Sequence, residues 1–236
     1  MIYGTNQIPK RFVDLELSLD GTPIERVDQY KYLGVIFDAN LNWSDHMNLA
    51  YKKATSKLFL DRKLRPFLEI KQAKTVFTAL VQSILDYGDT IWFSSQKTFQ
   101  SVQNKGMRCI LNIPDKLIRA HPISDLLDTI DWTDLGTHRQ QHRCRLASCS
   151  LRGYVPPYLL RILSKRNFRN HPSTRASFRQ TFDIPLTANE TAECAFSVTM
   201  LRILNNFDDV LLDAASLRVF NSHLRSHFVN LICDHT

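Results

Sequence analysis

Two pairs of carboxylates are the residues of this sequence that could support hydrolytic chemistry. The run Phe207-Asp208-Asp209 joins an aromatic residue to an acidic pair, and paired carboxylates can hold the divalent metal ions of a nuclease. Asp86 and Asp89 flank Tyr87-Gly88 and could act as a general acid and a general base. No nucleophile or histidine lies near Asp86 and Asp89 in the sequence, and a two-metal site demands more geometry than one acidic pair supplies. We therefore expect packing or helix-end roles for both pairs.

Cysteine and histidine spacing argues against a structural zinc site. The five cysteines include no Cys-x2-Cys pair. The two nearest approaches to a zinc motif have unusual spacings: His138, His142 and Cys144, and His223, His227 and Cys233. We therefore expect no bound metal. The odd number of cysteines favours free thiols in a reducing compartment.

Basic residues indicate a polyanionic partner. The net charge is +7, and the first basic stretch has eight cations against Asp61 and Glu69: Lys52, Lys53, Lys57, Arg62, Lys63, Arg65, Lys71 and Lys74. Such side chains bind nucleic-acid phosphates without sequence preference. The alternative is an ordinary solvated helix face.

The second basic block is denser. From Leu135 through Phe182 the chain has ten Lys or Arg and no Asp or Glu. Arg139 and Arg143 are one turn apart and share a helical face. Arg166 and Arg169 fall in a predicted loop, 164–180, where Phe168 and Phe178 interleave with the arginines. Aromatic and guanidinium groups together suit unstacked bases of single-stranded RNA, although the two phenylalanines could equally anchor the loop to the core.

The elements that must position these groups begin with a predicted hairpin. Val13, Leu15, Leu17 and Leu19 alternate with polar residues, Asp20-Gly21 supplies a turn, and Tyr32–Phe37 is predicted as the partner strand. Gly34 then lies inside that strand, where a missing side chain lets a sugar-phosphate backbone approach closely. A β-bulge or a tight packing contact is the alternative reason for a glycine there.

Helical periodicity dominates the remainder of the chain. Apolar side chains recur at three- and four-residue spacing, and glycine or proline marks several of the ends. The predicted helices are Ser44 to about Arg62, a stripe from Ala73 to Ile84 ending near Tyr87-Gly88, Phe99–Ile110 ended by Pro114, a short helix from Pro122, a long helix from Leu135 to Gly153 with Leu135, His142, Leu146 and Cys149 near one face, and a final amphipathic helix over 217–231.

Several blocks occur in an order that resembles one protein family. They are YKYLGVIFDANLNWSDH at 30–46, a lysine-rich helix, LVQSILDYGDTIW at 80–92, Trp132 to Leu135, and Pro156 to Leu159. This order is similar to the C-terminal third of reverse transcriptases from non-LTR (LINE-type, jockey or CR1-like) retrotransposons. The resemblance implies that Tyr32, Leu33 and Gly34 belong to the primer grip at the edge of the palm, and that the following helices form the thumb and contact the template-primer duplex.

The same resemblance implies further expectations. Tyr87-Gly88 followed by Trp92 is a packing element with the tryptophan inward, and a Leu-Asn-Asn-aromatic stretch like 204–207 is usual near the C-terminus. The family's metal-binding aromatic-x-Asp-Asp motif lies upstream of the grip, and MIYGTN resembles the last palm strand before it. Met1 is therefore expected to be an internal methionine of a longer polyprotein, or a start assigned in a truncated copy.

The expected biochemistry follows from that missing motif. Alone, the chain is expected to be non-catalytic, without a cofactor, whereas the intact parent enzyme would use Mg²⁺. The expected partners are RNA or an RNA–DNA duplex and the palm and fingers of the parent polymerase, with no small-molecule substrate. The N-terminus is polar, and no apolar run approaches the length needed to cross a bilayer. No membrane partner and an intracellular location, cytoplasmic or nuclear, are therefore expected.

The predicted fold class is α+β and mostly helical. The expected organisation is a palm-edge or primer-grip hairpin at 1–40, thumb-like helices at 41–115, and a helical connector at 116–236 containing the basic loop. Three functions remain open. They are a non-catalytic reverse transcriptase fragment that binds RNA or duplex through backbone contacts, a host-retained RNA- or protein-binding module whose hairpin is merely structural, and a metal-dependent nuclease using Asp208 and Asp209.

Overall fold

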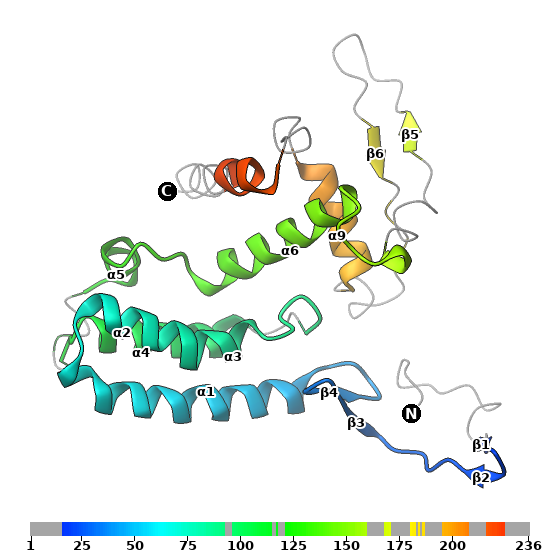
Figure 1. Ribbon diagram of the computed structural model, residues 1–236, viewed down its shortest axis with the longest axis horizontal. Helices are drawn as coiled ribbons and strands as arrows, with labels where there is room; N and C mark the ends of the chain where they lie inside the picture. The colour runs from blue at the N-terminus through cyan, green and yellow to red at the C-terminus, as the bar shows by residue number, and fades with distance from the viewer. Residues whose placement is uncertain are drawn as a thin grey trace. The chain divides into compact units, whose positions relative to one another are not determined.

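The chain is mostly helical, with short antiparallel hairpins, in the α+β class that the sequence predicts (Figure 1). The computed structural model describes residues 16–92, 96–114, 117, 121–159, 168–170, 180–182, 184, 186, 195–207 and 216–224. Packing divides the chain into two units, each described below by itself. Unit 1 is Met1–Gly88 with Ser94–Leu126, and unit 2 is Asp89–Phe93 with Leu127–Thr236.

Unit 1 opens with a short hairpin whose turn the sequence predicts. Strand β1 (Ser18–Leu19) pairs antiparallel with β2 (Thr22–Pro23). Asp20 and Gly21 join the strands with φ angles of 50° and 77°. Two successive residues with positive φ are typical of a type I′ turn, and Asp-Gly is a favoured pair for it.

The second hairpin corrects the prediction for Tyr32–Phe37, which is neither one continuous strand nor the partner of the strand that ends at Leu19. Strand β3 (Gln29–Tyr32) pairs antiparallel with β4 (Val35–Asp38), and Tyr32 lies opposite Val35. Leu33 and Gly34 form the turn between them, with φ angles of 46° and 83°. The twist of a two-residue hairpin requires positive φ at both positions, which glycine adopts without strain. Gly34 is therefore a turn residue and not a gap inside a strand.

The first helix of unit 1 begins at Ser44 as predicted, whereas the helices predicted from Ala73 and Phe99 each begin three residues earlier. Helix α1 (Ser44–Leu64) buries Ala50, Ala54, Leu58 and Asp61, a stripe with three- and four-residue spacing. The single turn η2 (Arg65–Phe67) leads to α2 (Ile70–Phe77), a π-helical segment η3 (Thr78–Gln82) and α3 (Ser83–Asp86). Figure 1 shows α1 running along the layer made by α2, α3 and α4 (Gln96–Ile110). The shorter α5 spans Ile123–Thr129.

Large apolar side chains from these helices fill the interior of unit 1. The most completely buried of them are Phe77, Val81, Leu85, Phe99, Val102, Met107 and Ile110. The predicted ends near Tyr87-Gly88 and Pro114 are confirmed, because α3 ends at Asp86 and α4 at Ile110. In the described part of the chain, no helix combines the length and the apolar character needed to cross a membrane.

Unit 2 is centred on α6 (Leu135–Leu151), which packs on α9 (Phe196–Asn206). Asp134 caps α6, since its Oδ1 accepts a hydrogen bond from the backbone N–H of Thr137 at 3.1 Å. The buried set of α6 differs from the predicted stripe. His142, Leu146 and Cys149 are only half-buried, whereas the fully buried positions include Arg139, Arg143, Cys144 and Ala147. Residues 217–224 are helical as predicted, with Phe220 and Leu224 buried, and 225–231 lie outside the described residues.

The residues of the predicted loop 164–180 that the structure describes are in strands and not in a loop. Strand β5 (Phe168–Asn170) pairs antiparallel with β6 (Gln180–Phe182). Asn205 of the Leu-Asn-Asn-Phe stretch holds β6 by its side-chain amide. Its Oδ1 accepts from the Phe182 N–H at 2.7 Å, and its Nδ2 donates to the Phe182 carbonyl at 2.9 Å. This two-point contact fixes β6 beside α9 and gives the asparagine a structural role.

Candidate nucleic-acid interface

The second hairpin presents its outer strand to solvent. All four residues of β3 are exposed, whereas β4 packs against α1 and buries Val35 and Asp38. At the tip, the Leu33 side chain is 73% exposed and that of Tyr32 is 58% exposed. The two side chains assigned to the primer grip are thus accessible to a partner. Their contact with nucleic acid stays a prediction.

One buried carboxylate organises the link between this hairpin and α1. Asp38 Oδ1 accepts hydrogen bonds from the backbone N–H groups of Asn40 (3.0 Å) and Asn42 (3.1 Å). Its Oδ2 accepts from the Trp43 N–H at 2.9 Å. Leu41 and Trp43 have φ angles of 54° and 64°, which are unusual for side chains of their size. The three hydrogen bonds to the Asp38 carboxylate stabilise this unusual backbone conformation. They therefore hold the link between β4 and α1 in one shape.

Further contacts attach the hairpin to the helices of unit 1. His46 accepts at Nδ1 a hydrogen bond from the Ile36 N–H, at 3.3 Å. Burial, with a smaller contribution from Lys53, lowers the pKa of His46 and favours the neutral imidazole that this bond requires. Tyr87, from the end of α3, donates its hydroxyl to the Leu33 carbonyl at 2.5 Å. The hairpin therefore folds back on the helices of unit 1.

Gly34 is required by its conformation and by its neighbour. A Cβ built on Gly34 would lie 3.3 Å from Tyr87 Cε1, and one built on Gly21, which has nearly the same φ, would meet nothing within 4 Å. This geometry matches the tight packing contact that the sequence analysis gave as an alternative. The turn and the Tyr87 contact explain the glycine without a bound sugar-phosphate backbone.

We expect Gly34→Ala to lower the free energy of unfolding more than Gly21→Ala does. A left-handed alanine costs about 1 kcal/mol at each turn, and crowding against Tyr87 adds about 1 kcal/mol at Gly34 alone. Denaturant titration of the two variants measures the difference. Equal losses would mean that Tyr87 does not crowd the turn.

The predicted phosphate contacts on α1 are all accessible. Between Tyr51 and Leu64 the exposed cations are Lys52, Lys53, Lys57, Arg62 and Lys63. Lys53 and Lys57 are one turn apart on the same face, but Lys52 lies about 100° from Lys53 around the helix axis. Lys63 Nζ lies 4.7 Å from the centre of the Phe59 ring, a cation–π distance. The cations therefore surround the exposed side of α1 and do not form a single row.

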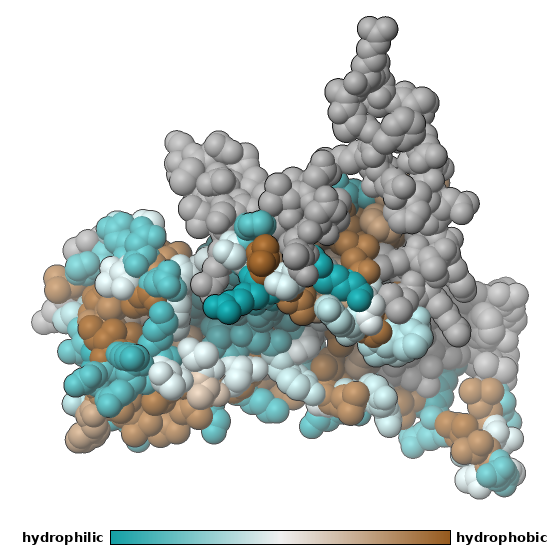
Figure 2. Space-filling view, turned by 45° about the horizontal axis from the view of Figure 1, so that its top comes forward, coloured by the Kyte–Doolittle hydropathy of each residue, from teal (hydrophilic) through white to brown (hydrophobic). Residues whose placement is uncertain are grey.

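Apolar side chains are also exposed where α1 passes into α2. They are Phe59, Leu60, Leu64, Phe67 and Ile70, and we call them the apolar end surface. The Phe67 side chain is 83% exposed. Figure 2 shows hydrophobic surface gathered at this end of unit 1, with hydrophilic residues beside it. A patch of this kind is more typical of an interaction surface than of a solvated helix end.

Asp61 is the single acidic residue of α1 after its first turn, and its carboxylate is buried. The Cys109 thiol lies beside it and is a weak donor, and neither Asp61 oxygen makes a hydrogen bond of ordinary geometry. Burial raises the pKa of Asp61, against smaller opposing effects of Cys109 and Arg65. Burial, followed by the Asp61 carboxylate, raises the pKa of the Cys109 thiol to about 11.

We expect Asp61→Asn to stabilise the protein at neutral pH. Because folding raises the pKa of Asp61, the folded state binds the proton more tightly, and wild-type stability is lost as pH rises through the folded pKa. The variant should be more stable by about 1 kcal/mol near neutral pH, with the gain vanishing toward about pH 4, where the unfolded side chain also protonates. Denaturant titrations across this range measure the difference. A variant less stable than wild type at neutral pH would indicate a partner for the carboxylate.

The second group of predicted cations is placed differently. Arg139 and Arg143 share a face of α6, but their side chains are only 1% and 5% exposed. The Arg139 guanidinium lies 4.7 Å from the centre of the Trp92 ring, and Trp92 is fully buried as predicted. In this conformation neither arginine has the accessible surface that a phosphate contact requires, because both are used in packing. The remaining predictions here lie outside the described residues: Arg166, the side chains of Phe168 and Arg169, Phe178, Asp208 and Asp209, His227, and Cys233.

Asp86 and Asp89 each have a hydrogen-bond partner. In unit 1, Asp86 Oδ1 accepts from Gln82 Nε2 at 2.7 Å. In unit 2, Asp89 Oδ2 lies 2.8 Å from His142 Nδ1, across 53 residues of sequence. His142 also lies against His138, with ring centres 4.4 Å apart. The contact between Asp89 and His142 was missed in the sequence analysis, because the two residues lie far apart along the chain.

Comparison with known proteins relates the chain to one class of enzyme. It is 27% identical over 169 residues to a Drosophila melanogaster protein described as probable RNA-directed DNA polymerase from transposon BS. The match covers 66% of this chain and 18% of that relative, so the chain spans a small part of the polymerase. No family model matches the sequence. No solved structure matches it.

This similarity supports the coarser part of the sequence interpretation, a segment related to a transposon reverse transcriptase. The relative is named for polymerase activity, and that activity belongs to a protein much longer than this chain. The assignment to the non-LTR class, the thumb and grip designations, and nucleic-acid binding are therefore carried forward as proposals.

Proposed function

We propose that this chain is the C-terminal, nucleic-acid-holding segment of a non-LTR-type reverse transcriptase, with unit 1 acting as primer grip and thumb. In this role it binds RNA or an RNA–DNA duplex through backbone phosphates and leaves the metal-dependent chemistry to the palm of the parent polymerase. Mg²⁺ is then a cofactor of the intact enzyme and not of this segment.

The observation that carries the proposal is the charge of α1. Between Tyr51 and Leu64 five cations are exposed, while the single carboxylate, Asp61, is buried and does not oppose them at the surface. The exposed charge of this stretch is thus entirely positive. The chain is similar to a transposon RNA-directed DNA polymerase, which suggests RNA or DNA as the polyanion that these cations bind. Contacts to phosphates fit a polymerase, because the enzyme must move along its substrate without sequence preference.

The exposed hairpin tip extends the proposed interface. Tyr32 and Leu33 project from a turn that is tied to α1 through Asp38 and His46 and to α3 through Tyr87. A rigidly held tip can contact the primer backbone at a fixed position relative to the basic helix. This supports the grip assignment for Tyr32 and Leu33, with Gly34 providing the turn.

Salt dependence tests the proposal. We expect the full chain to bind a fluorescent RNA–DNA duplex with a log affinity that falls by about 0.9 per phosphate contact against log salt concentration. Changing Lys53 and Lys57 together to glutamine should make that slope shallower by about 2. The matched control is Arg202→Gln with Arg218→Gln, two exposed cations of unit 2, which should leave the slope unchanged. Duplex affinity that does not depend on salt would contradict the proposal.

The apolar end surface supports a second candidate, a host-retained module that binds protein. Its exposed members, of which Phe67 is the most exposed, could cover a partner or the remainder of a polymerase. Under this alternative the chain binds a protein partner and shows no salt-dependent affinity for duplex. Phe67→Ser would then abolish partner binding, whereas the double lysine variant would not.

A further inference from the structure

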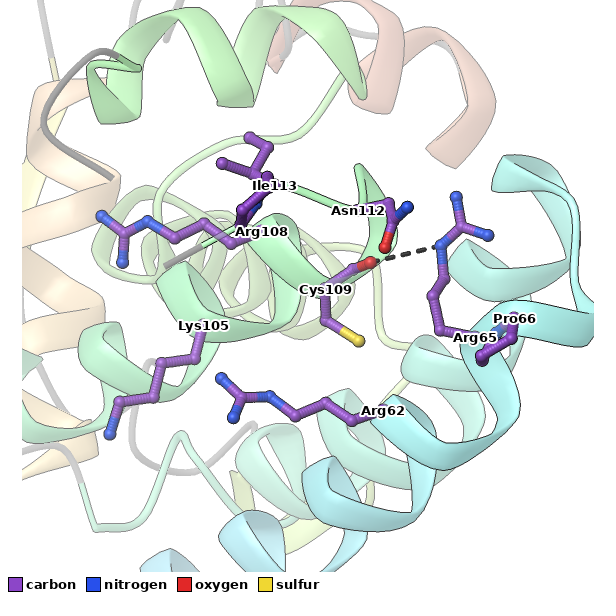
Figure 3. Close-up of a pocket in the computed structure, with 9 residues that line it drawn as sticks. Arg62, Arg65, Pro66, Lys105, Arg108, Cys109, Asn112 and Ile113 are labelled. Atoms are coloured by element: carbon purple, nitrogen blue, oxygen red, sulfur yellow. Dashed lines mark hydrogen bonds between the residues drawn. The ribbon is translucent and has the colours of Figure 1, made fainter. Parts of the chain in front are cut away.

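A cationic pocket in unit 1 lies beside the proposed interface. It has a volume of about 380 Å³ and is lined by the end of α1, by η2, and by the second half of α4 with the residues that follow it. Four of its nine lining residues are cations, Arg62, Arg65, Lys105 and Arg108, and none of the nine is acidic. Figure 3 shows the Arg62 side chain extending from α1 past Cys109 toward Lys105 of α4.

The four cations do not have equal roles. The Arg65 guanidinium donates from Nε to the carbonyls of Cys109 (3.2 Å) and Ile110 (2.9 Å), and from Nη1 to that of Leu68 (2.6 Å). These bonds satisfy carbonyl groups at the end of α4 and fix Arg65 in the wall of the pocket. Arg62, Lys105 and Arg108 are left as the cations that a ligand could meet.

Arg108 has an unsatisfied donor beside the pocket. Its Nε is buried and has no hydrogen-bond partner within the described residues. A buried donor without an acceptor is costly. An anionic oxygen in the pocket would satisfy that donor once the Arg108 side chain turns toward it, because the Nε has no accessible surface in this conformation.

The shape of the pocket selects among nucleic-acid ligands. Its volume is near the lower end of the range for small-molecule sites, so it suits one nucleotide and cannot accept the convex backbone of a duplex. Pro66, Ile113 and Pro114 add apolar surface to the lining. A base can lie against such a surface while arginine and lysine hold its phosphate.

We propose that this pocket binds one unpaired nucleotide by its phosphate, at a single-stranded end or overhang adjoining the duplex held by α1. Naming nucleic acid as the source of that nucleotide rests on the proposed function. The preference for a nucleotide phosphate rests on the pocket alone. The phosphate can be a terminal monoester or an internal diester of the overhang, and the two share the same chemistry of recognition.

The experiment compares duplexes that differ only at their ends. The full chain is titrated with a blunt RNA–DNA duplex and with the same duplex carrying a short overhang, ending in 5′-phosphate or 5′-hydroxyl. We expect the overhang to tighten binding about tenfold, as one charge-assisted phosphate contact would. A gain with both ends indicates an internal phosphate, and a gain with 5′-phosphate alone indicates a terminal one. Equal affinity for the blunt and overhang duplexes would overturn the proposal.

Variants separate the pocket from the α1 face. Lys105→Gln with Arg108→Gln should abolish the gain from the overhang and leave affinity for blunt duplex near that of wild type. Lys53→Gln with Lys57→Gln should weaken both duplexes and preserve their ratio. Lys105 is exposed, so Lys105→Gln alone covers the case in which the double variant fails to fold, with a partial loss of the gain expected. A pocket variant that weakens both duplexes equally would refute a separate nucleotide site.

Mononucleotides distinguish failure of this proposal from failure of the proposed function. Calorimetric titration with adenosine 5′-monophosphate, compared with adenosine, tests the pocket without a duplex. Binding of the monophosphate alone, lost in Lys105→Gln, would support the pocket even if the chain had no affinity for duplex. Salt-dependent duplex binding with no response to a 5′-monophosphate or an overhang would retain the proposed function and reject the pocket.

Discussion

Asp38→Ala is expected to lower the free energy of unfolding by about 3 kcal/mol or more, because one carboxylate accepts three backbone hydrogen bonds and a bond to a charged group contributes a net of about 1.5 to 3 kcal/mol. The N–H groups of Asn40, Asn42 and Trp43 lose their acceptor together. The left-handed backbone at Trp43 then loses its hydrogen bond to the carboxylate and keeps, within the described residues, only the contact of its ring with Phe37 and the helical bond from Met47. The hairpin should loosen from α1 before the helices unfold.

A second acidic residue at the same junction provides the control. Asp45 accepts one side-chain hydrogen bond, from Gln29 Nε2, and is exposed. Asp45→Ala should therefore cost less than about 1 kcal/mol. Denaturant titration measures both losses, and hydrogen exchange at the amides of β3 and β4 locates the opening. Equal and small losses in the two variants would show that the loop keeps its shape without Asp38.

The functional consequence follows from the same contact. If the tip holds a primer backbone, Asp38→Ala should weaken duplex binding even at temperatures where the helices stay folded, because Tyr32 and Leu33 lose their fixed position. Asp45→Ala should leave that binding close to wild type. The pair of variants thus relates the local order of the hairpin to its proposed role.

Local signals made the helices predictable. The helices that end just before Gly88, before Pro114 and near Gly153 each combine apolar periodicity with a residue that cannot easily continue a helix. The Asp20-Gly21 turn is equally local, since Asp-Gly favours the required backbone without any tertiary partner. Such features depend on neighbouring residues alone and can be inferred from the sequence.

Prediction from the sequence failed where contacts between residues far apart in the sequence determine the structure. Leu33 is an uncommon residue for the first position of a type I′ turn, and it is held there by the Tyr87 hydroxyl, 54 residues away. Arg139 and Arg143 appear as surface cations in the sequence, yet Arg139 packs on Trp92. The Asp89–His142 contact spans 53 residues. In each case charge or β-propensity suggested one role, and burial against a remote partner determined another.

In the candidate site, too, some features follow from local sequence and others depend on tertiary packing. Exposure of the α1 cations follows from helical geometry once the apolar stripe is known, because the side chains off that stripe must face solvent. The pocket could not be inferred, because it requires Arg62 and Arg108, which belong to different helices, to line one cavity near the end of α4. A sequence pattern assigns charges to helices, but only the packing of α1 on α4 creates a concave cationic site.

Gly106→Ala is expected to lower the free energy of unfolding by about 3 kcal/mol. At an exposed helical position, glycine to alanine stabilises by about 1 kcal/mol, so the sign here reverses. The reason is close packing, since a Cβ on Gly106 would lie 2.0 Å from Cε2 of the Phe77 ring. Phe77 is fully buried and cannot move aside without displacing other core side chains. The free energy of unfolding from denaturant titration measures the loss.

A double variant identifies the cause of that loss. Phe77→Leu alone should cost about 1 kcal/mol through lost packing, and combined with Gly106→Ala it should recover at least about 1 kcal/mol relative to the sum of the single losses. Lys105→Ala, at the exposed neighbouring position of α4, controls for helix propensity and should change stability by less than about 0.5 kcal/mol. Strict additivity of Gly106→Ala and Phe77→Leu would show that the two side chains are not in contact and that α1, α2 and α4 pack differently. Because the cationic pocket depends on the position of α4 in unit 1, Gly106→Ala should also reduce the affinity for an overhang duplex.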